Sequence, residues 1–169
     1  MSSRTLYDED ILLWSEEQAA LIRELGNRRF ARSNELDLEN VAEEIESVGR
    51  SELASVESQL QNILLHLIKL SAEPRSESVR HRPVEVLSFH ADMRRRYAPS
   101  MQQRIDLDQL WRIARKLAIL GAPDGMDLGE RLPISAPLDL GELLGHELDV
   151  DALIGQIARS DFDLNVPRL

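Results

Sequence analysis

The chain has 169 residues, of which 43% are hydrophobic, 4% aromatic and 30% charged. This length suits one domain with a sizeable core, and the high charged fraction favours helices over a sandwich or barrel. The lack of cysteine excludes disulfides, thiolate nucleophiles and iron–sulfur clusters, while the net charge of −10 disfavours general attraction to nucleic acid or anionic membranes.

No apolar run is long enough to cross a bilayer, which takes about 20 residues. The longest runs have only a few residues, as in Ile63–Leu65. The amino terminus becomes acidic at Asp8, before the apolar core of a signal peptide could form. We therefore expect a cytoplasmic protein that does not insert into a membrane.

The first predicted helix begins after Asp8 or Asp10, since either carboxylate can cap it. Its apolar residues recur with helical spacing as far as Leu25. Gly26 then provides a stop signal, and the polar stretch 28–35 is predicted to be a connection.

Asp37 is predicted to cap the next helix, whose apolar stripe ends at Val48. A leucine-rich helical pattern follows from Ser51 to Leu70. Gly49 lies between them, and the sequence leaves open whether the chain turns back there or continues as one helix. Glycine inside a helix costs only about 1 kcal/mol relative to alanine. Over 63–70 the apolar residues almost encircle the helix, which predicts a central helix or one covered by another chain.

Two more helices are predicted in the middle of the chain. Pro74 ends the leucine-rich helix, and the next begins between Ser76 and Pro83 and stops at Pro99. A further helix lies within Ser100–Leu120. Residues 121–125, which contain two glycines and a proline, are predicted to break the chain.

Residues 122–169 are richer in proline and glycine than the rest. Two short helices are predicted there, at about Leu138–Leu144 and Asp149–Ser160, and no stretch of the chain alternates as a strand would. The predicted fold class is all-α, a helical bundle of about five main helices over 1–121. The C-terminal arm, 122–169, is predicted to pack on this core as part of one domain.

Charge is segregated along the chain. Residues 1–73 carry 7 basic and 15 acidic side chains, residues 74–116 carry 10 and 5, and residues 117–169 carry 3 and 10. The favoured interpretation is internal pairing of the basic middle with the acidic flanks. The alternative is that the basic stretch 80–116, which includes Arg94–Arg96, binds phosphates and makes the protein a weak nucleic-acid binder.

The sequence contains no phosphate loop, zinc-protease motif, serine nucleophile elbow or calcium loop. We therefore assign no catalytic, metal or cofactor site, and name Glu44, Glu46 and His66 as candidates should one exist. Glu44 and His66 are too far apart to share an ion within one hairpin, so only another helix or a second chain could bring them together. The favoured interpretation of His66 is a core histidine bonded to a carbonyl or a nearby acid.

Several segments together resemble a known family. They are Tyr7-Asp8-Glu9-Asp10 with Trp14 and Gln18, Leu36–Glu46, and Leu64–Lys69 with Pro74. The combination resembles a bacterial family of small helical proteins known as domain of unknown function number twenty-nine, over residues 5–75 and more loosely to about 150. The resemblance implies a helical fold and a bacterial origin, and it implies no activity.

Three functions from different classes follow from these observations. The leading hypothesis is a non-enzymatic interaction protein whose partner is a second copy, forming a homodimer, or an unknown protein. The first alternative is a metal-dependent or acid/base enzyme that uses Glu44 and His66 from different helices. The second is nucleic-acid binding through 80–116, which the acidic chain disfavours.

Overall fold

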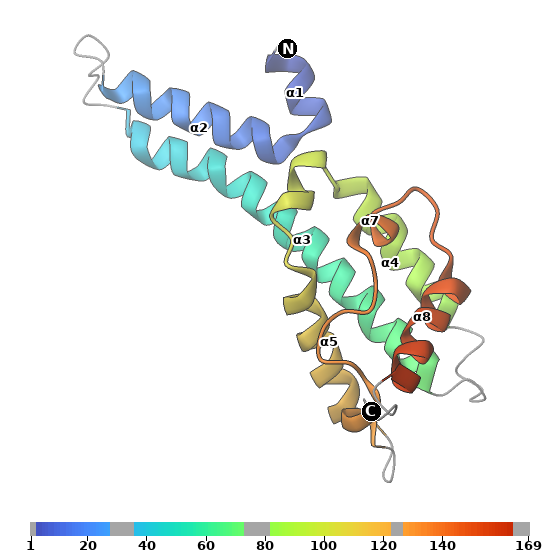
Figure 1. Ribbon diagram of the computed structural model, residues 1–169. Coiled ribbons are helices and arrows are strands. Elements are labelled where there is room, and N and C mark those ends of the chain that lie inside the picture. Colours follow the sequence, from blue (N-terminus) through green and yellow to red (C-terminus); the bar gives the residue numbers. More distant parts are fainter. Residues whose placement is uncertain (1–2, 28–35, 73–81, 123–126, 164–169) are drawn as a thin grey trace. The chain divides into compact units, whose positions relative to one another are not determined.

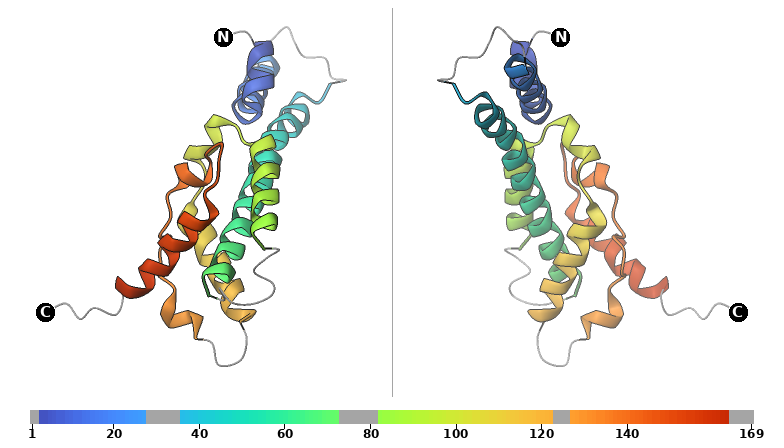
Figure 2. Two further views of the ribbon diagram at one scale, coloured as in Figure 1. Left: turned by 90° about the vertical axis from the view of Figure 1, so that its right-hand side faces the viewer. Right: turned by 90° about the vertical axis from the view of Figure 1, so that its left-hand side faces the viewer.

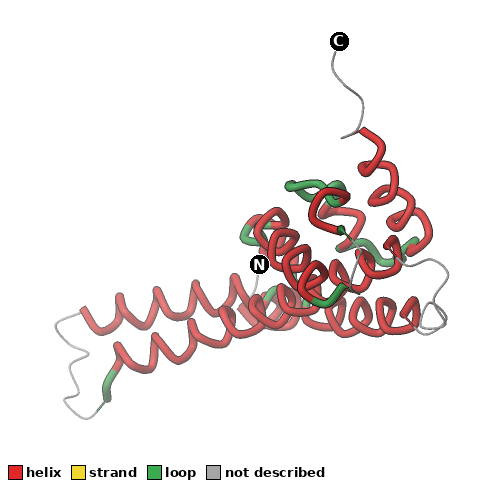
Figure 3. Tube along the Cα trace, turned by 90° about the horizontal axis from the view of Figure 1, so that it is seen from below, coloured by secondary structure: helices red, strands yellow, loops and turns green. Residues whose placement is uncertain are grey.

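The computed structural model describes residues 3–27, 36–72, 82–122 and 127–163. Within these ranges the regular elements are helices, with no strand, so the predicted all-α helical bundle is confirmed (Figure 3). In chain order they are α1 (Ser3–Glu9), α2 (Ile11–Asn27), α3 (Leu38–Ala72), α4 (Arg82–Arg96), the 3-10 helix η2 (Pro99–Gln103), α5 (Leu107–Leu120), α6 (Leu128–Arg131), α7 (Leu140–Leu143) and α8 (Val150–Asp163), most of which are labelled in Figure 1.

The chain divides into two compact units. The first unit contains Met1–Val56 and Arg96–Ile105, and the second contains Glu57–Arg95 and Asp106–Leu169. Helix α3 contributes residues to both. The described part of the stretch predicted to be a C-terminal arm lies in the second unit, together with α4 and α5.

Helix α3 is continuous for 35 residues and passes through Gly49, which answers the question that the sequence left open. Its start is the predicted one, because Asp37 accepts a hydrogen bond from the backbone N–H of Asn40 at 3.1 Å. Pro74, the predicted stop, lies outside the described residues. The helix ends at Ala72, two residues before that proline.

The first unit is held together by a buried carboxylate at the start of α2. Asp10 is 7% exposed and accepts from the N–H of Leu13 at 3.0 Å, so it is Asp10 that caps this helix. The same carboxylate accepts from the N–H and the hydroxyl of Ser100 in η2, at 2.9 and 2.6 Å. One side chain thus joins segments 90 residues apart in sequence.

The second unit is built on the carboxyl-terminal half of α3, as the encircling apolar pattern predicted. Its buried side chains include Ile63, Leu64, Leu67, Ile68 and Leu70, each at most 3% exposed. Helix α4 runs beside this half of α3 (Figure 2). This apolar core therefore positions the polar side chains of the same helices, such as His66 on α3 and His90 on α4.

Helix α5 anchors the proline-rich segment that follows it. The indole N–H of Trp111, which is fully buried, donates to the Pro133 carbonyl at 2.9 Å. The guanidinium of Arg115 donates to the Leu132 carbonyl at 3.3 Å, and the Asp108 carboxylate accepts from the N–H of Ala136 at 2.8 Å. These bonds give hydrogen-bond partners to backbone groups of residues 132–136, which lie outside any helix.

Candidate interaction surface

Helix α2 and the part of α3 up to Val56 form an antiparallel hairpin, which lies in the first unit (Figure 1). A methyl group on Gly26 would lie 3.5 Å from Leu38, and Gly49 faces Leu12 and Ser15. The inward positions therefore follow steps of three and four residues, as in a coiled coil. This seam consists of Leu12, Ser15, Ala19, Ile22 and Gly26 on α2 and of Leu38, Ala42, Ile45 and Gly49 on α3.

Gly49 lies where the two helices approach closely. A Cβ atom there would be 2.1 Å from the Ser15 hydroxyl oxygen and 3.0 Å from the Cα of Leu12. Ser15 is fully buried, and its hydroxyl donates to the Leu12 carbonyl at 2.8 Å. Glycine is thus required here by the space between helices rather than by its backbone freedom.

Charged residues occupy one edge of the hairpin, at positions that directly follow seam residues. Arg23 on α2 pairs with Glu39 at 3.0 Å, with Glu46 at 2.8 Å and with Glu43 at 3.4 Å, all on α3. Arg50 pairs with Glu43 at 2.5 Å and with Glu46 at 3.6 Å. The hydrogen bond from Arg23 is the main cause of the lowered pKa of Glu46. Glu46, which the sequence analysis names as a candidate site residue, therefore pairs with the guanidinium groups of Arg23 and Arg50.

The opposite edge of the hairpin is mostly apolar, although Gln18, Asp37 and Glu44 also belong to it. It is formed by the residues that directly precede seam positions, and four of these are substantially exposed: Leu21 at 56%, Leu25 at 46%, Val41 at 37% and Val48 at 44%. The half-buried Ile11 and Trp14 occupy equivalent positions nearer the start of α2. We call these six residues the apolar edge.

Helix α1 packs on α2 at one end of the apolar edge. The ring of Tyr7 meets that of Trp14 edge to face, with centroids 4.8 Å apart. Glu44, the other acidic candidate, is exposed and lies between Val41 and Val48 along α3. Its place at the rim of the apolar stripe is the predicted one.

The structure does not pair Glu44 with His66. Both lie on α3, 22 positions apart in the sequence, which corresponds to about 33 Å along a helix. The carboxylate near His66 is that of Glu85 on α4, whose Oε2 lies 3.1 Å from the His66 Nδ1. The His66 ring also contacts Phe89 edge to face, with centroids 5.3 Å apart. His66 therefore lies beside an acid, and it is half-buried rather than part of the fully buried core.

Several basic side chains of the 80–116 stretch bind within the protein. Arg96 pairs with Glu52 at 3.0 Å, Arg104 pairs with Glu16 at 2.9 Å, Arg94 donates to the Leu144 carbonyl at 2.5 Å, and Arg115 donates to the carbonyl of residue 132. Internal pairing of the basic middle with acidic flanks is therefore observed for Arg96 and Arg104. Residues 80 and 81 of this stretch lie outside the described part of the chain.

His90 of α4 is a buried polar residue that the sequence analysis does not assign to a site. It is 6% exposed, and its Nε2 lies 3.0 Å from the Gly145 carbonyl oxygen. Because a carbonyl can only accept, Nε2 carries the proton. Burial lowers the pKa of His90, and the nearby charge of Arg94 lowers it further. The neutral imidazole therefore ties α4 to the turn after α7.

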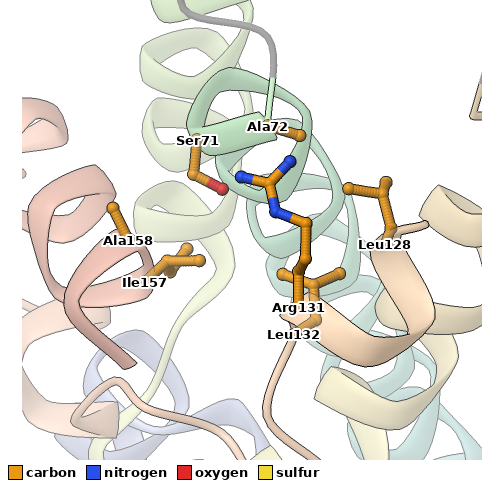
Figure 4. A pocket seen from close by; sticks show the side chains of 7 residues that line it. All are labelled: Ser71, Ala72, Leu128, Arg131, Leu132, Ile157 and Ala158. Carbon is orange, nitrogen blue, oxygen red and sulfur yellow. The ribbon is translucent and has the colours of Figure 1, made fainter. Parts of the chain in front are cut away.

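A small hollow in the second unit lies between the ends of α3, α6 and α8 (Figure 4). Figure 4 shows the Arg131 guanidinium beside Ser71 and Ala72 in the last turn of α3, where a cation interacts favourably with the helix dipole. The hollow has a volume of about 30 Å³. Small-molecule sites typically have about 300–1,000 Å³, so this space suits a water molecule.

Neither a metal cluster nor a membrane helix is found in the described ranges. No three His, Asp or Glu side chains of this part of the chain converge as ligands of a metal ion. Likewise, no described helix combines the length and apolar character needed to span a bilayer.

Comparison with known proteins finds a family match over most of the chain. Residues 6–157 match the family described as "Domain of unknown function DUF29". The chain is also similar to an alpha-helical protein of unknown function from Rhodospirillum rubrum ATCC 11170, solved by crystallography at 1.45 Å resolution. The sequence identity is 31% and the TM-score 0.81, over 89% of this chain and 96% of the other. No protein of curated function matches.

Proposed function

The chain belongs to the DUF29 family of proteins with unknown function, and from this premise we propose that it is a non-enzymatic interaction protein that forms homodimers through the apolar edge. The single observation that carries the proposal is the division of the α2–α3 hairpin into a charged edge and an apolar edge. Leu21, Leu25, Val41 and Val48 remain 37–56% exposed on the latter.

A second copy fits this surface because the apolar edge contains two antiparallel helices. Two such hairpins related by a two-fold axis present the same surface to each other, and together they form a four-helix arrangement. The ion pairs of Arg23 and Arg50 lie on the opposite edge, so dimerisation leaves them in solvent. On α3, the positions that precede seam residues include two acids, Asp37 and Glu44.

The exposed area limits how tight this dimer can be. Burying the remaining half of a leucine or valine side chain contributes about 1 kcal/mol, so four side chains on each of two copies contribute about 8 kcal/mol. Association itself costs about 4–15 kcal/mol. At best about 4 kcal/mol remains, so we expect a dimer that dissociates on dilution, with a dissociation constant of about 1 mM.

Sedimentation velocity over a concentration series of about 1–500 µM tests the proposal. The wild-type sedimentation coefficient should rise with concentration, whereas Leu21→Glu and Val41→Glu should stay monomeric, because each places a carboxylate inside the interface. Ile134→Glu is the matched control, since Ile134 is 77% exposed and lies in the second unit. Circular dichroism confirms that each variant is folded.

A wild-type protein that stays monomeric throughout this range overturns the proposal. So does concentration-dependent association that the two edge variants leave unchanged.

We further propose that the protein acts in the cytoplasm of a bacterium. The similar solved chain comes from Rhodospirillum rubrum, which supports a bacterial origin. Fractionation of the native host with an antibody against the protein checks the location, and recovery in the periplasm or with membranes would contradict it.

A further inference from the structure

The sequence from Leu132 to Ala158 contains no lysine or arginine. It contains five acids, namely Asp139, Glu142, Glu147, Asp149 and Asp151. None of the five forms an ion pair with a described lysine or arginine side chain. Among the described residues, this part of the second unit therefore presents acids that pair with no lysine or arginine side chain.

Two hollows flank the segment Glu147–Asp149 at this place. One has a volume of about 490 Å³ and is bounded by Pro83 and Leu87 of α4 and by the first residues of α8. The other has about 220 Å³ and lies between Glu142 of α7 and the first two turns of α8. We call the two together the acidic groove.

Apolar side chains line the acidic groove beneath its acids. Leu148 borders both hollows, Leu153 borders the smaller one, and Leu87 borders the larger one with 48% of its surface exposed. One turn before Leu87, Val84 is 67% exposed. Apolar anchors surrounded by a charged rim are typical of a surface that binds another protein segment.

Two of the acids are held in place by the helices. Asp149 accepts from the N–H of Ala152 at 2.9 Å and so caps α8, and Glu142 accepts from the side-chain amide of Gln156 at 3.1 Å. Across the described ranges no acids converge closely enough to hold a metal ion. A spread of single carboxylates suits several separate cationic side chains better than one ion.

We propose that the acidic groove binds a basic amphipathic helix of a partner protein. Leucine-type side chains of that helix contact Leu87 and Leu148, and its lysines or arginines pair with Glu147 and Asp151. This is the helix-in-groove mode of recognition, in which residues one turn apart provide the anchors. The groove lies in the second unit, so this proposal stands whether or not the apolar edge forms a dimer.

Fluorescence anisotropy with a labelled 14-residue peptide tests the proposal. The probe has leucine at helical spacing and lysine elsewhere, and the control probe has glutamate in place of lysine. The lysine probe should bind saturably at low salt and lose affinity at high salt, because the pairs formed are exposed. The glutamate probe should not bind.

Paired charge variants separate the groove from general attraction to an acidic protein. Glu147→Gln with Asp151→Asn should weaken binding of the lysine probe about tenfold. The matched control, Glu9→Gln with Glu17→Gln, removes the same charge from exposed positions in the first unit and should leave binding unchanged.

Equal weakening by both double variants, or no binding of the lysine probe, overturns the proposal. Sedimentation of Glu147→Gln with Asp151→Asn provides a further check. If this variant no longer self-associates while the wild type does, the groove is filled by a second copy, and the assignment to a partner protein is wrong.

Discussion

Replacing Gly49 by alanine tests the close helix contact on which the hairpin depends. The new Cβ atom would lie 2.1 Å from the Ser15 hydroxyl oxygen, 3.0 Å from the Leu12 Cα and 3.1 Å from the Leu12 Cδ1. The hydroxyl can rotate away only by giving up its hydrogen bond to the Leu12 carbonyl. The Cα atom belongs to the backbone of α2, so relieving that contact requires the two helices to separate.

Two effects of opposite sign decide the magnitude. Alanine is favoured over glycine inside a helix by about 1 kcal/mol. Overpacking a well-filled contact costs about 1–3 kcal/mol, and losing the buried hydrogen bond of Ser15 costs about 1 kcal/mol more. We therefore expect Gly49→Ala to lower the free energy of unfolding by about 1–3 kcal/mol, which lowers Tm by about 3–10 °C for a chain of this length.

Thermal and urea unfolding followed by circular dichroism measure this effect. Gly155→Ala is the matched control, because Gly155 lies inside α8 and its Cβ would meet only the end of Arg159, at 3.8 Å. This control should gain about 0.5–1 kcal/mol. Adding Ser15→Ala to Gly49→Ala should recover part of the loss. If Gly49→Ala instead stabilises the protein as Gly155→Ala does, the close contact is not present in solution.

Three further substitutions test other contacts. Asp10→Ala should lower the free energy of unfolding by about 2–4 kcal/mol, because it removes the cap of α2 and leaves the part-buried N–H of Ser100 without its acceptor. Asp10→Asn should lose less in the same urea titration. Burial lowers the pKa of His90, so the unfolded chain takes up a proton first as the pH falls below 6.5, and stability should decrease there; His90→Gln should flatten this part of the curve of Tm against pH. Arg23→Gln should lower Tm slightly at low salt and have no effect in 1 M salt, because its ion pairs are exposed. Its effect should also decline as the pH falls below 4.5 toward the lower pKa that Arg23 gives Glu46.

The sequence was sufficient for the main helices because their signals are local. Asp37 and Asp10 cap the predicted helices, and the encircling apolar pattern marks the buried half of α3. The short helices α1 and α6 and the 3-10 helix η2 were not predicted, since so few residues show no periodicity. The helix predicted within Ser100–Leu120 is α5, which begins at Leu107 because Asp106 caps it.

The two edges of the hairpin could not be assigned without knowing the path at Gly49. A turn there would have paired the residues before it with those after it, whereas a continuous α3 leaves them free to pair with α2. The contact of Gly49 with Leu12 and Ser15 distinguishes a turn from a continuous helix, and both of these residues are far from Gly49 in the sequence. His90 was missed for a similar reason, because its partner carbonyl is 55 residues further along the chain.

The chain contains two tryptophans, and each compact unit holds one of them. Trp14 is half-buried beside Tyr7 in the first unit, whereas Trp111 is fully buried in the second with its indole N–H bonded to a carbonyl. Replacing either one by phenylalanine leaves a single tryptophan, whose emission maximum reports on one unit alone. Denaturation curves recorded on the two single-tryptophan proteins would therefore reveal whether the units melt together or in sequence.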